Sequence, residues 1–340
     1  MPNQEKFNEL EQAIIKTLAF FNIFDYPLTL VEIHKWLYCQ NKEKETMLLN
    51  ESSEQDSIRL NKKYSLSKIY EELENIVLKG DISSKNGFYF LPDRADIIRT
   101  RLYRYQLAEK KFKIALRATR LFKRLAPVKM VSVCNNVGYN NGTEKSDIDL
   151  FIIVKKNRLW LSRFLVTIIT TLLGVRRHDQ KFIDRICLSF YIAEDQLDLS
   201  NISLKPDDIY LVFWLATLAT IYDDGIYQSF FEANKWIFNY LPNHYPTLLN
   251  GRRCENCTGF FSSSRKYNNF VFKWIGDIME KIARLVQVRK VRKYFGQSPT
   301  DLGSNVVISR SMFKFHKTDR REFYRQEWEK KIKELNIKYV

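Results

Sequence analysis

The stretch VSVCNNVGYNNGTEKSDIDLFIIV, residues 131–154, constrains the fold more than any other part of the chain. An apolar run leads into a turn rich in Asn and Gly, and a second apolar run begins at Asp147 and Asp149. Residues two apart on a strand point to the same face, so these carboxylates can converge on one cation while Ile148 and Leu150 face the core. The stretch therefore predicts two strands joined by a polar turn, with a metal site where the second strand begins.

This arrangement resembles the active-site hairpin of the nucleotidyltransferase (DNA polymerase β-like) superfamily, over roughly residues 128 to 195. In that family a Gly-Ser turn holds a nucleoside triphosphate and paired Asp residues bind magnesium. The resemblance implies Mg²⁺ as cofactor, a nucleoside triphosphate as substrate, and Asp147 and Asp149 as catalytic, metal-binding residues. It further implies a set of nucleotide-binding residues in the turn: Asn135, Asn136, Gly138 and Ser146. Asn135 and Asn136 stand where the family has Gly-Ser, although Asn tolerates a left-handed backbone better than most residues.

The apolar run at residues 186–192 predicts the next strand, where the family carries a third metal-binding carboxylate. This chain has Cys187 and Ser189 at the candidate positions. The nearest acids are Asp184 before the run and Glu194 and Asp195 after it. Two-metal chemistry commonly uses a further anionic ligand, so two hypotheses stay open. The chain is either a transferase that moves a nucleoside monophosphate to a hydroxyl, or a catalytically weakened relative that binds nucleotide or a partner as a regulatory module.

The N-terminal residues 1–93 carry a pattern of three helices followed by a hairpin. Apolar residues at helical spacing predict helices over 7–21, 30–37 and 67–79, and Asn86-Gly87 is a strong hairpin signal. Three helices and a two-stranded wing indicate a winged helix. Its third helix carries Glu71, Glu72 and Glu74, which phosphate would repel, so a protein-contact or scaffold role is favoured over reading of duplex DNA.

The rest of the chain is expected to be mainly helical, giving an α+β fold with a small mixed sheet. Residues 94–127 form one long helical pattern, a basic connector, and residues 128–200 form the nucleotidyltransferase-like core. The region 201–340 is expected to be a helical C-terminal extension. With only 11 Gly and 8 Pro in 340 residues, few tight turns interrupt these helices.

The net charge of +16 is concentrated in two blocks. Residues 99–129 hold eleven Lys and Arg against one acid, and residues 281–340 hold sixteen against six. Basic residues interleaved with aromatic ones suit a surface that follows phosphates, so RNA, DNA or a protein acceptor is a candidate partner. A solvated helix face is an equally open interpretation of both blocks.

The sequence favours a cytoplasmic protein without a membrane span. The two most apolar runs, 164–175 and 209–221, are shorter than the roughly 20 residues needed to cross a bilayer. The first residues are too polar for a signal peptide, and five scattered cysteines do not suggest a disulfide framework.

Overall fold

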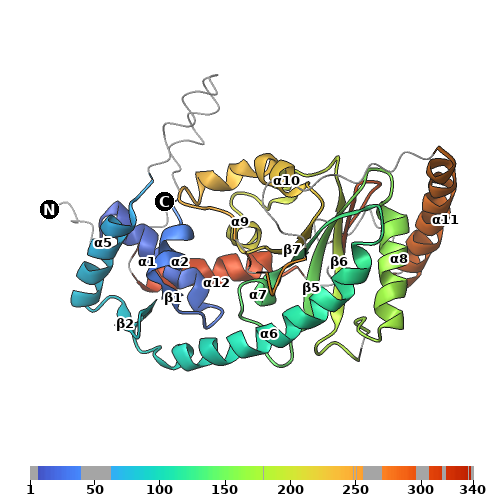
Figure 1. The fold of residues 1–340 in the computed structure, drawn as a ribbon. Helices are drawn as coiled ribbons and strands as arrows, with labels where there is room; N and C mark the ends of the chain where they lie inside the picture. Colours follow the sequence, from blue (N-terminus) through green and yellow to red (C-terminus); the bar gives the residue numbers. More distant parts are fainter. Residues whose placement is uncertain are drawn as a thin grey trace, which may run out of the picture.

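The computed structural model describes residues 7–39, 63–178, 180–247, 249, 251–255, 270–295, 306–315, 319–335 and 337. These residues form an α+β fold with two sheets, of three and six strands. Figure 1 shows the smaller sheet and its helices at one end of an elongated molecule and the larger sheet toward the other end.

The N-terminal unit forms the helices and the hairpin that the sequence predicts. Its helices are α1 (Glu9–Asn22), α2 (Leu30–Lys35) and α5 (Leu66–Leu78), and its strands are β1 (Leu28–Thr29), β2 (Ser83–Lys85) and β3 (Phe88–Phe90), in the order β1-β3-β2. Thr29 begins α2 with a capping box that it forms with Glu32. Asn86 and Gly87 both have positive φ, 55° and 76°, as the tight turn between β2 and β3 requires.

The larger sheet has the strand order β7-β4-β5-β6-β9-β8. Its strands are β4 (Val128–Val133), β5 (Ile148–Val154), β6 (Ile186–Ala193), β7 (Ala219–Asp223), β8 (Val306–Ile308) and β9 (Met312–Phe315). Strand β5 lies at its centre, antiparallel to β4 and parallel to β6. Three of the six strands, β7, β8 and β9, come from residues 201–340, the region expected to be helical.

The run at 209–221 was expected to be one helix, and it is a helix followed by a strand. Helix α9 (Ile209–Ala216) ends at Thr217, and β7 begins two residues later and pairs with β4. Both elements are largely buried, so apolar residues dominate the run and its periodicity does not separate the two. Strand β7 lies at the edge of the sheet, beside the strand that leads into the candidate site.

The remaining helices are α6 (Asp96–Phe122), α7 (Asn135–Gly138), α8 (Leu159–Leu172), α10 (Tyr227–Ala233), α11 (Phe270–Phe295) and α12 (Arg321–Glu334). In Figure 1, α6 runs from the N-terminal unit past α7 to the larger sheet. Helices α8 and α11 pack together at the opposite end of the molecule. The N-cap of α8 is Arg158, and Asn157 before it adopts a left-handed φ of 57°.

The core of the N-terminal unit is not self-contained. Phe20 stacks on Phe213 of α9, and the indole Nε1 of Trp328 in α12 donates to the carbonyl oxygen of Lys16 in α1. Residues far apart in the sequence therefore share one apolar cluster.

None of the helices in the described residues is both long enough and apolar enough to cross a membrane.

Cys254 is disulfide-bonded, which the scatter of cysteines along the sequence did not lead us to expect.

Candidate active site

Asp147, Asp149 and Cys187 form a cluster at the start of β5 and β6. One possible ligand atom from each residue lies within 4.8 Å of the others, and no second such group occurs in the part of the chain that the structure describes. Asp147 precedes β5, and Asp149 is its second residue, so the two carboxylates converge as their spacing predicts. The parallel register of β5 and β6 places Cys187 directly beside Asp149.

The two carboxylates have different electrostatic surroundings. Burial and the nearby Asp147 carboxylate raise the pKa of Asp149 to about 6. The amide Nδ2 of Asn135 donates to Asp149 Oδ2 at 2.7 Å, which works in the opposite direction by stabilising the carboxylate. Asp147 instead accepts a hydrogen bond from Arg177, with Nη1 2.5 Å from Oδ2. The site therefore holds one ion-paired carboxylate and one that takes up a proton easily.

Cys187 occupies the position on β6 where the resemblance implies a third carboxylate. Burial and then the charges of Asp149 and Asp147 raise the pKa of its thiol well above the ordinary value, so the thiol is neutral. Mg²⁺ prefers oxygen ligands, and a neutral thiol offers little to such a cation. The donors that suit Mg²⁺ in this cluster are the two carboxylates.

The other acids near β6 are engaged elsewhere. Lys110 and Lys111 both donate to Asp184 at 2.6 Å. Burial raises the pKa of the Asp184 carboxyl, but these two hydrogen bonds lower it by more, so that the pKa lies below its usual range. Glu194 and Asp195 follow the opposite end of β6, where each contacts Lys156. None of these three acids belongs to the cluster.

Asn135 is the turn residue that reaches the carboxylates. Its φ of 55° lies in the left-handed region, which Asn adopts more readily than most residues. Its side chain spans the gap between two elements, because Nδ2 donates to Asp149 while Oδ1 accepts from the hydroxyl of Tyr210 at 3.4 Å. Asn135 therefore combines a left-handed backbone with a hydrogen bond to the cluster.

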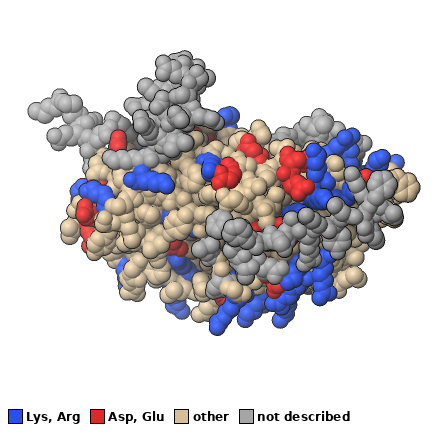
Figure 2. All heavy atoms as spheres, turned by 45° about the horizontal axis from the view of Figure 1, so that its top comes forward, with Lys and Arg blue, Asp and Glu red and all other residues tan. Residues whose placement is uncertain are grey.

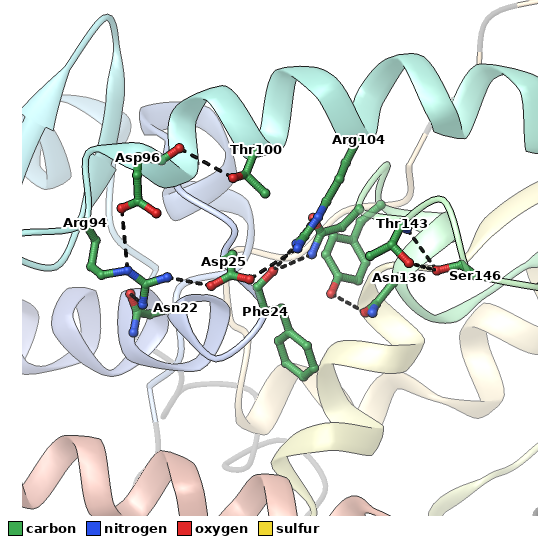
Figure 3. A network of polar contacts seen from close by, with 12 residues as sticks. Asn22, Phe24, Asp25, Arg94, Asp96, Thr100, Arg104, Asn136, Thr143 and Ser146 are labelled. Atoms are coloured by element: carbon green, nitrogen blue, oxygen red, sulfur yellow. Dashed lines mark hydrogen bonds and ion pairs between the residues drawn. The ribbon is translucent and has the colours of Figure 1, made fainter.

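Asn136 and Ser146 have side-chain partners within the turn itself. Asn136 Oδ1 accepts from the hydroxyl of Tyr139 at 2.7 Å, and Ser146 Oγ accepts from the backbone N–H of Thr143 at 2.9 Å. Figure 3 shows both residues beside the helix α6, in contacts that shape the loop before Asp147. Of the four turn residues implied by the resemblance, only Asn135 donates a hydrogen bond to a member of the cluster.

Gly138 is required for close packing rather than for conformational freedom. A Cβ added there would lie 2.9 Å from the carbonyl oxygen of Val133 and 3.0 Å from that of Thr217. Its φ is not positive, in contrast to that of Asn135. The glycine therefore lets α7 approach the end of β4 and the end of α9 together.

Helix α6 fixes the turn through buried cations. Lys111, only 1% exposed, donates from Nζ to the carbonyl oxygen of Ser146 at 2.7 Å and to Asp184. Arg104 donates to Asp25, as Figure 3 shows. It also donates to Asn141, which lies in the loop after α7. A large part of the basic block 99–129 is thus structural.

A smaller set of cations on α6 and just after it remains on the surface. The exposed residues without a partner among the described residues are Arg99, Lys113, Arg117 and Arg124. The last three share one helical face with Arg120, which pairs with Glu255. Figure 2 shows Lys and Arg along the lower edge of the molecule and again toward the end where α8 and α11 lie.

A cavity of about 200 Å³ opens beside the cluster. Its walls include Asn135, four aromatic side chains (Phe190, Tyr210, Trp214 and Tyr324) and the buried Lys314. Arg321 closes one side, where Asp208 and Asp319 hold it by ion pairs of 2.7 and 2.6 Å. Sequence reasoning missed this cavity because its residues come from α7, α9, β9 and α12, and no local pattern joins them.

We compared the chain with protein-family models, with curated proteins and with solved structures, and none of them matched it.

Proposed function

We propose that this chain is a magnesium-dependent nucleotidyltransferase that moves a nucleoside monophosphate from a nucleoside triphosphate to a hydroxyl. In this proposal residues 128–200 are a nucleotidyltransferase-type core and residues 1–93 a winged helix. The observation that carries it is the convergence of Asp147 and Asp149 beside the left-handed turn residue Asn135. Folding brings two partly accessible carboxylates close together and raises the pKa of one of them, which costs free energy. This cost favours a functional reason for their presence.

The donor set fits one magnesium ion. Mg²⁺ is commonly bound by one or two carboxylates, and substrate phosphates and waters complete its coordination. Asp147 and Asp149 supply those carboxylates. A bound Mg²⁺ neutralises charge on the phosphate oxygens and activates the attacking hydroxyl. Asn135 orients Asp149 by its hydrogen bond, and Arg177 is placed to exchange its ion pair with Asp147 for one with a phosphate.

The cavity beside Asn135 suits the nucleoside part of the substrate. It is smaller than the roughly 300–1,000 Å³ of pockets that enclose whole drug-sized ligands, so it fits a base or a ribose rather than a complete nucleotide. Aromatic walls favour stacking on a planar base. Because Asn135 both lines the cavity and contacts Asp149, a base held there leaves its phosphates directed to the carboxylates.

The second candidate is a module that binds nucleotide or a partner without transfer. Two observations favour it: Cys187 stands where a third anionic ligand would be, and the Arg177 guanidinium already neutralises Asp147. These features weaken a two-metal arrangement without removing a nucleotide site. In either case the exposed face of α6 with Lys113, Arg117 and Arg124 is the surface we propose for an RNA, DNA or protein acceptor.

The test is incubation of the full chain with labelled nucleoside triphosphates, magnesium and total cellular RNA or protein. We expect a labelled acceptor with the wild-type chain and none with Asp149→Asn. The matched control is Asp195→Asn, a carboxylate beyond the far end of β6, which should transfer normally. If no acceptor is labelled but the chain still binds nucleotide in a magnesium-dependent manner, the transferase proposal is wrong and the binding-module proposal is favoured.

The acceptor surface is tested separately. If α6 follows phosphates, affinity for RNA or DNA falls steeply with added salt and falls again in Lys113→Glu with Arg117→Glu. Affinity that does not respond to salt would contradict this surface while leaving the transferase proposal intact.

A further inference from the structure

Helix α11 exposes a broad apolar side to solvent, while its side turned toward the protein mixes polar and apolar residues. It packs on α8, and its inward side carries the polar residues Asp277, Glu280 and Gln287 together with the buried Ala283 and Val291. An ordinary surface helix buries its apolar stripe and exposes its charges. The further apolar side that α11 leaves exposed indicates a partner other than the described core of this chain.

Specific polar contacts fix α11 in this orientation. The carboxylate of Glu280 accepts from the backbone N–H groups of Trp160 and Leu161, at 2.9 and 2.8 Å, in the first turn of α8. Gln287 donates to the carbonyl oxygen of Trp160 at 2.8 Å, and Asp277 pairs with Arg158 at 2.6 Å. Rotation of α11 about its axis would break all of these contacts, so its apolar side cannot turn inward at small cost.

The outward side of α11 is a continuous apolar face, which we call the α11 face. Its members follow one another at helical spacing: Trp274, Ile275, Ile278, Met279, Ile282, Leu285 and Val286. Trp274 is 65% exposed, whereas the other five tryptophans of the chain are buried or partly buried. Exposed apolar patches of this kind mark interaction or membrane sites.

The charges around the α11 face are all positive. Lys281, Arg284, Arg289 and Lys290 are exposed and have no partner among the described residues. The two acids of α11, Asp277 and Glu280, are both used in contacts with α8. The partner of the α11 face must therefore combine an apolar surface with negative charge.

A second copy of the chain fits this requirement poorly. Ile275, Ile278, Ile282 and Leu285 follow the spacing of a coiled-coil seam, but the next seam position is Arg289. Pairing two copies of α11 brings cations near cations without an acid to neutralise them. An anionic lipid bilayer meets both demands, because its acyl region takes apolar side chains and its headgroups attract Lys and Arg.

We propose that α11 is a peripheral membrane-binding helix that lies in the interface of a bilayer containing anionic lipids. Trp274 and the aliphatic residues of the α11 face enter the headgroup and acyl boundary, while Lys281 and Arg284 contact the headgroups. Neither the cluster of Asp147, Asp149 and Cys187 nor the cavity beside Asn135 takes part, so this proposal stands or falls independently of the transferase.

The experiment measures flotation of the full chain with phosphatidylcholine vesicles that contain or lack phosphatidylserine. We expect binding to the anionic vesicles that falls with salt, and a shift of Trp274 emission to shorter wavelength that is absent in Trp274→Phe. Replacing Ile278, Ile282 and Leu285 together by Ser should weaken binding by more than about tenfold. The matched control is Leu78→Ser with Leu102→Ser, which removes exposed leucines from α5 and α6 and should leave binding unchanged.

A pair of charge variants separates α11 from the other basic helix. Lys281→Glu with Arg284→Glu should abolish the preference for phosphatidylserine, while Lys113→Glu with Arg117→Glu should retain it. Failure of the wild-type chain to float with anionic vesicles would overturn the proposal. The proposal would also be overturned if the wild-type chain dimerised without binding lipid and the triple Ser variant abolished that dimerisation. A second copy of the chain would then be the occupant of the α11 face. If the triple variant does not fold, the charge variants and Trp274→Phe decide the question.

Discussion

Cys187 lies beside Asp149 across the parallel pairing of β5 and β6, so a neutral thiol occupies the space next to the most buried carboxylate of the candidate site. The neutral thiol does not repel the two carboxylates, so it destabilises the folded chain less than a third carboxylate would. It also supplies no third anionic ligand. This one position sets both the stability of the metal-free chain and its capacity for a cation.

Replacing Cys187 by Asp should tighten Mg²⁺ binding by about tenfold or more, because a third carboxylate adds charge within a few ångströms of the cation. In chelator the same variant should melt below the wild type, since three carboxylates repel one another. Calorimetric titration with Mg²⁺ and thermal unfolding in chelator measure the two effects. Cys187→Ser is the control of similar size. An unchanged Mg²⁺ affinity in Cys187→Asp would refute the placement of the cation beside Asp147, Asp149 and Cys187.

Removing Arg177 should strengthen Mg²⁺ binding several-fold. Its guanidinium competes for Asp147 and also lowers the pKa of Asp149, so Arg177→Ala should raise that pKa further in the absence of metal. Mg²⁺ titration and carboxyl titration followed by NMR measure these outcomes. Lys181→Ala, an exposed cation of the same loop, serves as the control. A weaker Mg²⁺ affinity in Arg177→Ala would contradict the competition.

Asp149 should make the metal-free chain less stable as the pH rises from about 4 to about 6. Its pKa in the folded chain is raised to about 6, so between these values the folded state binds the extra proton and the unfolded state does not. The free energy of unfolding therefore falls as that proton is lost. At pH 7 the free energy of unfolding of Asp149→Asn should exceed that of the wild type by about 3 kcal/mol, and this advantage should largely disappear toward pH 4.

Urea unfolding in chelator at several pH values tests this prediction. Asp195→Asn is the control, because it makes the same change of side chain beyond the far end of β6, outside the cluster. A difference between Asp149→Asn and the wild type that stays constant from pH 4 to 7 would exclude the proton linkage.

Gly138→Ala should cost about 1–3 kcal/mol of stability. The added Cβ would approach two backbone carbonyl oxygens, those of Val133 and Thr217, and neither can move as a side chain can. Gly251→Ala is the matched control, since a Cβ there meets no atom within 4 Å. Thermal or urea unfolding measures both variants, and equal effects would argue against the close packing of α7.

The parts of the fold that the sequence predicts are those that local chemistry determines. Thr29 begins a helix because its hydroxyl caps the backbone, and Asn86-Gly87 forms a turn because both residues accept positive φ. The pairing of Asp147 with Asp149 follows from the two-residue period of a strand. Each of these features depends on residues close together in the sequence.

The parts that were missed depend on residues brought together only by folding. Strand β7 was not distinguished from a helix because apolar residues dominate its largely buried run and mask the period of a strand. The engagement of Asn136 with Tyr139 and the use of Lys111 to hold Ser146 depend on side-chain geometry. The net charge of residues 99–129 did not reveal that many of those cations form internal ion pairs.

The hydrogen bond from Trp328 to Lys16 joins residues 312 positions apart. During synthesis on the ribosome, the N-terminal helices emerge long before α12, and their apolar cluster lacks Trp328 and Ile332 until then. Strands β8 and β9 are likewise made late, although they extend the sheet beyond β6. We expect the nascent chain to stay incompletely packed, and to depend on chaperones, until the segment that contains α12 is free to fold back onto the first helix.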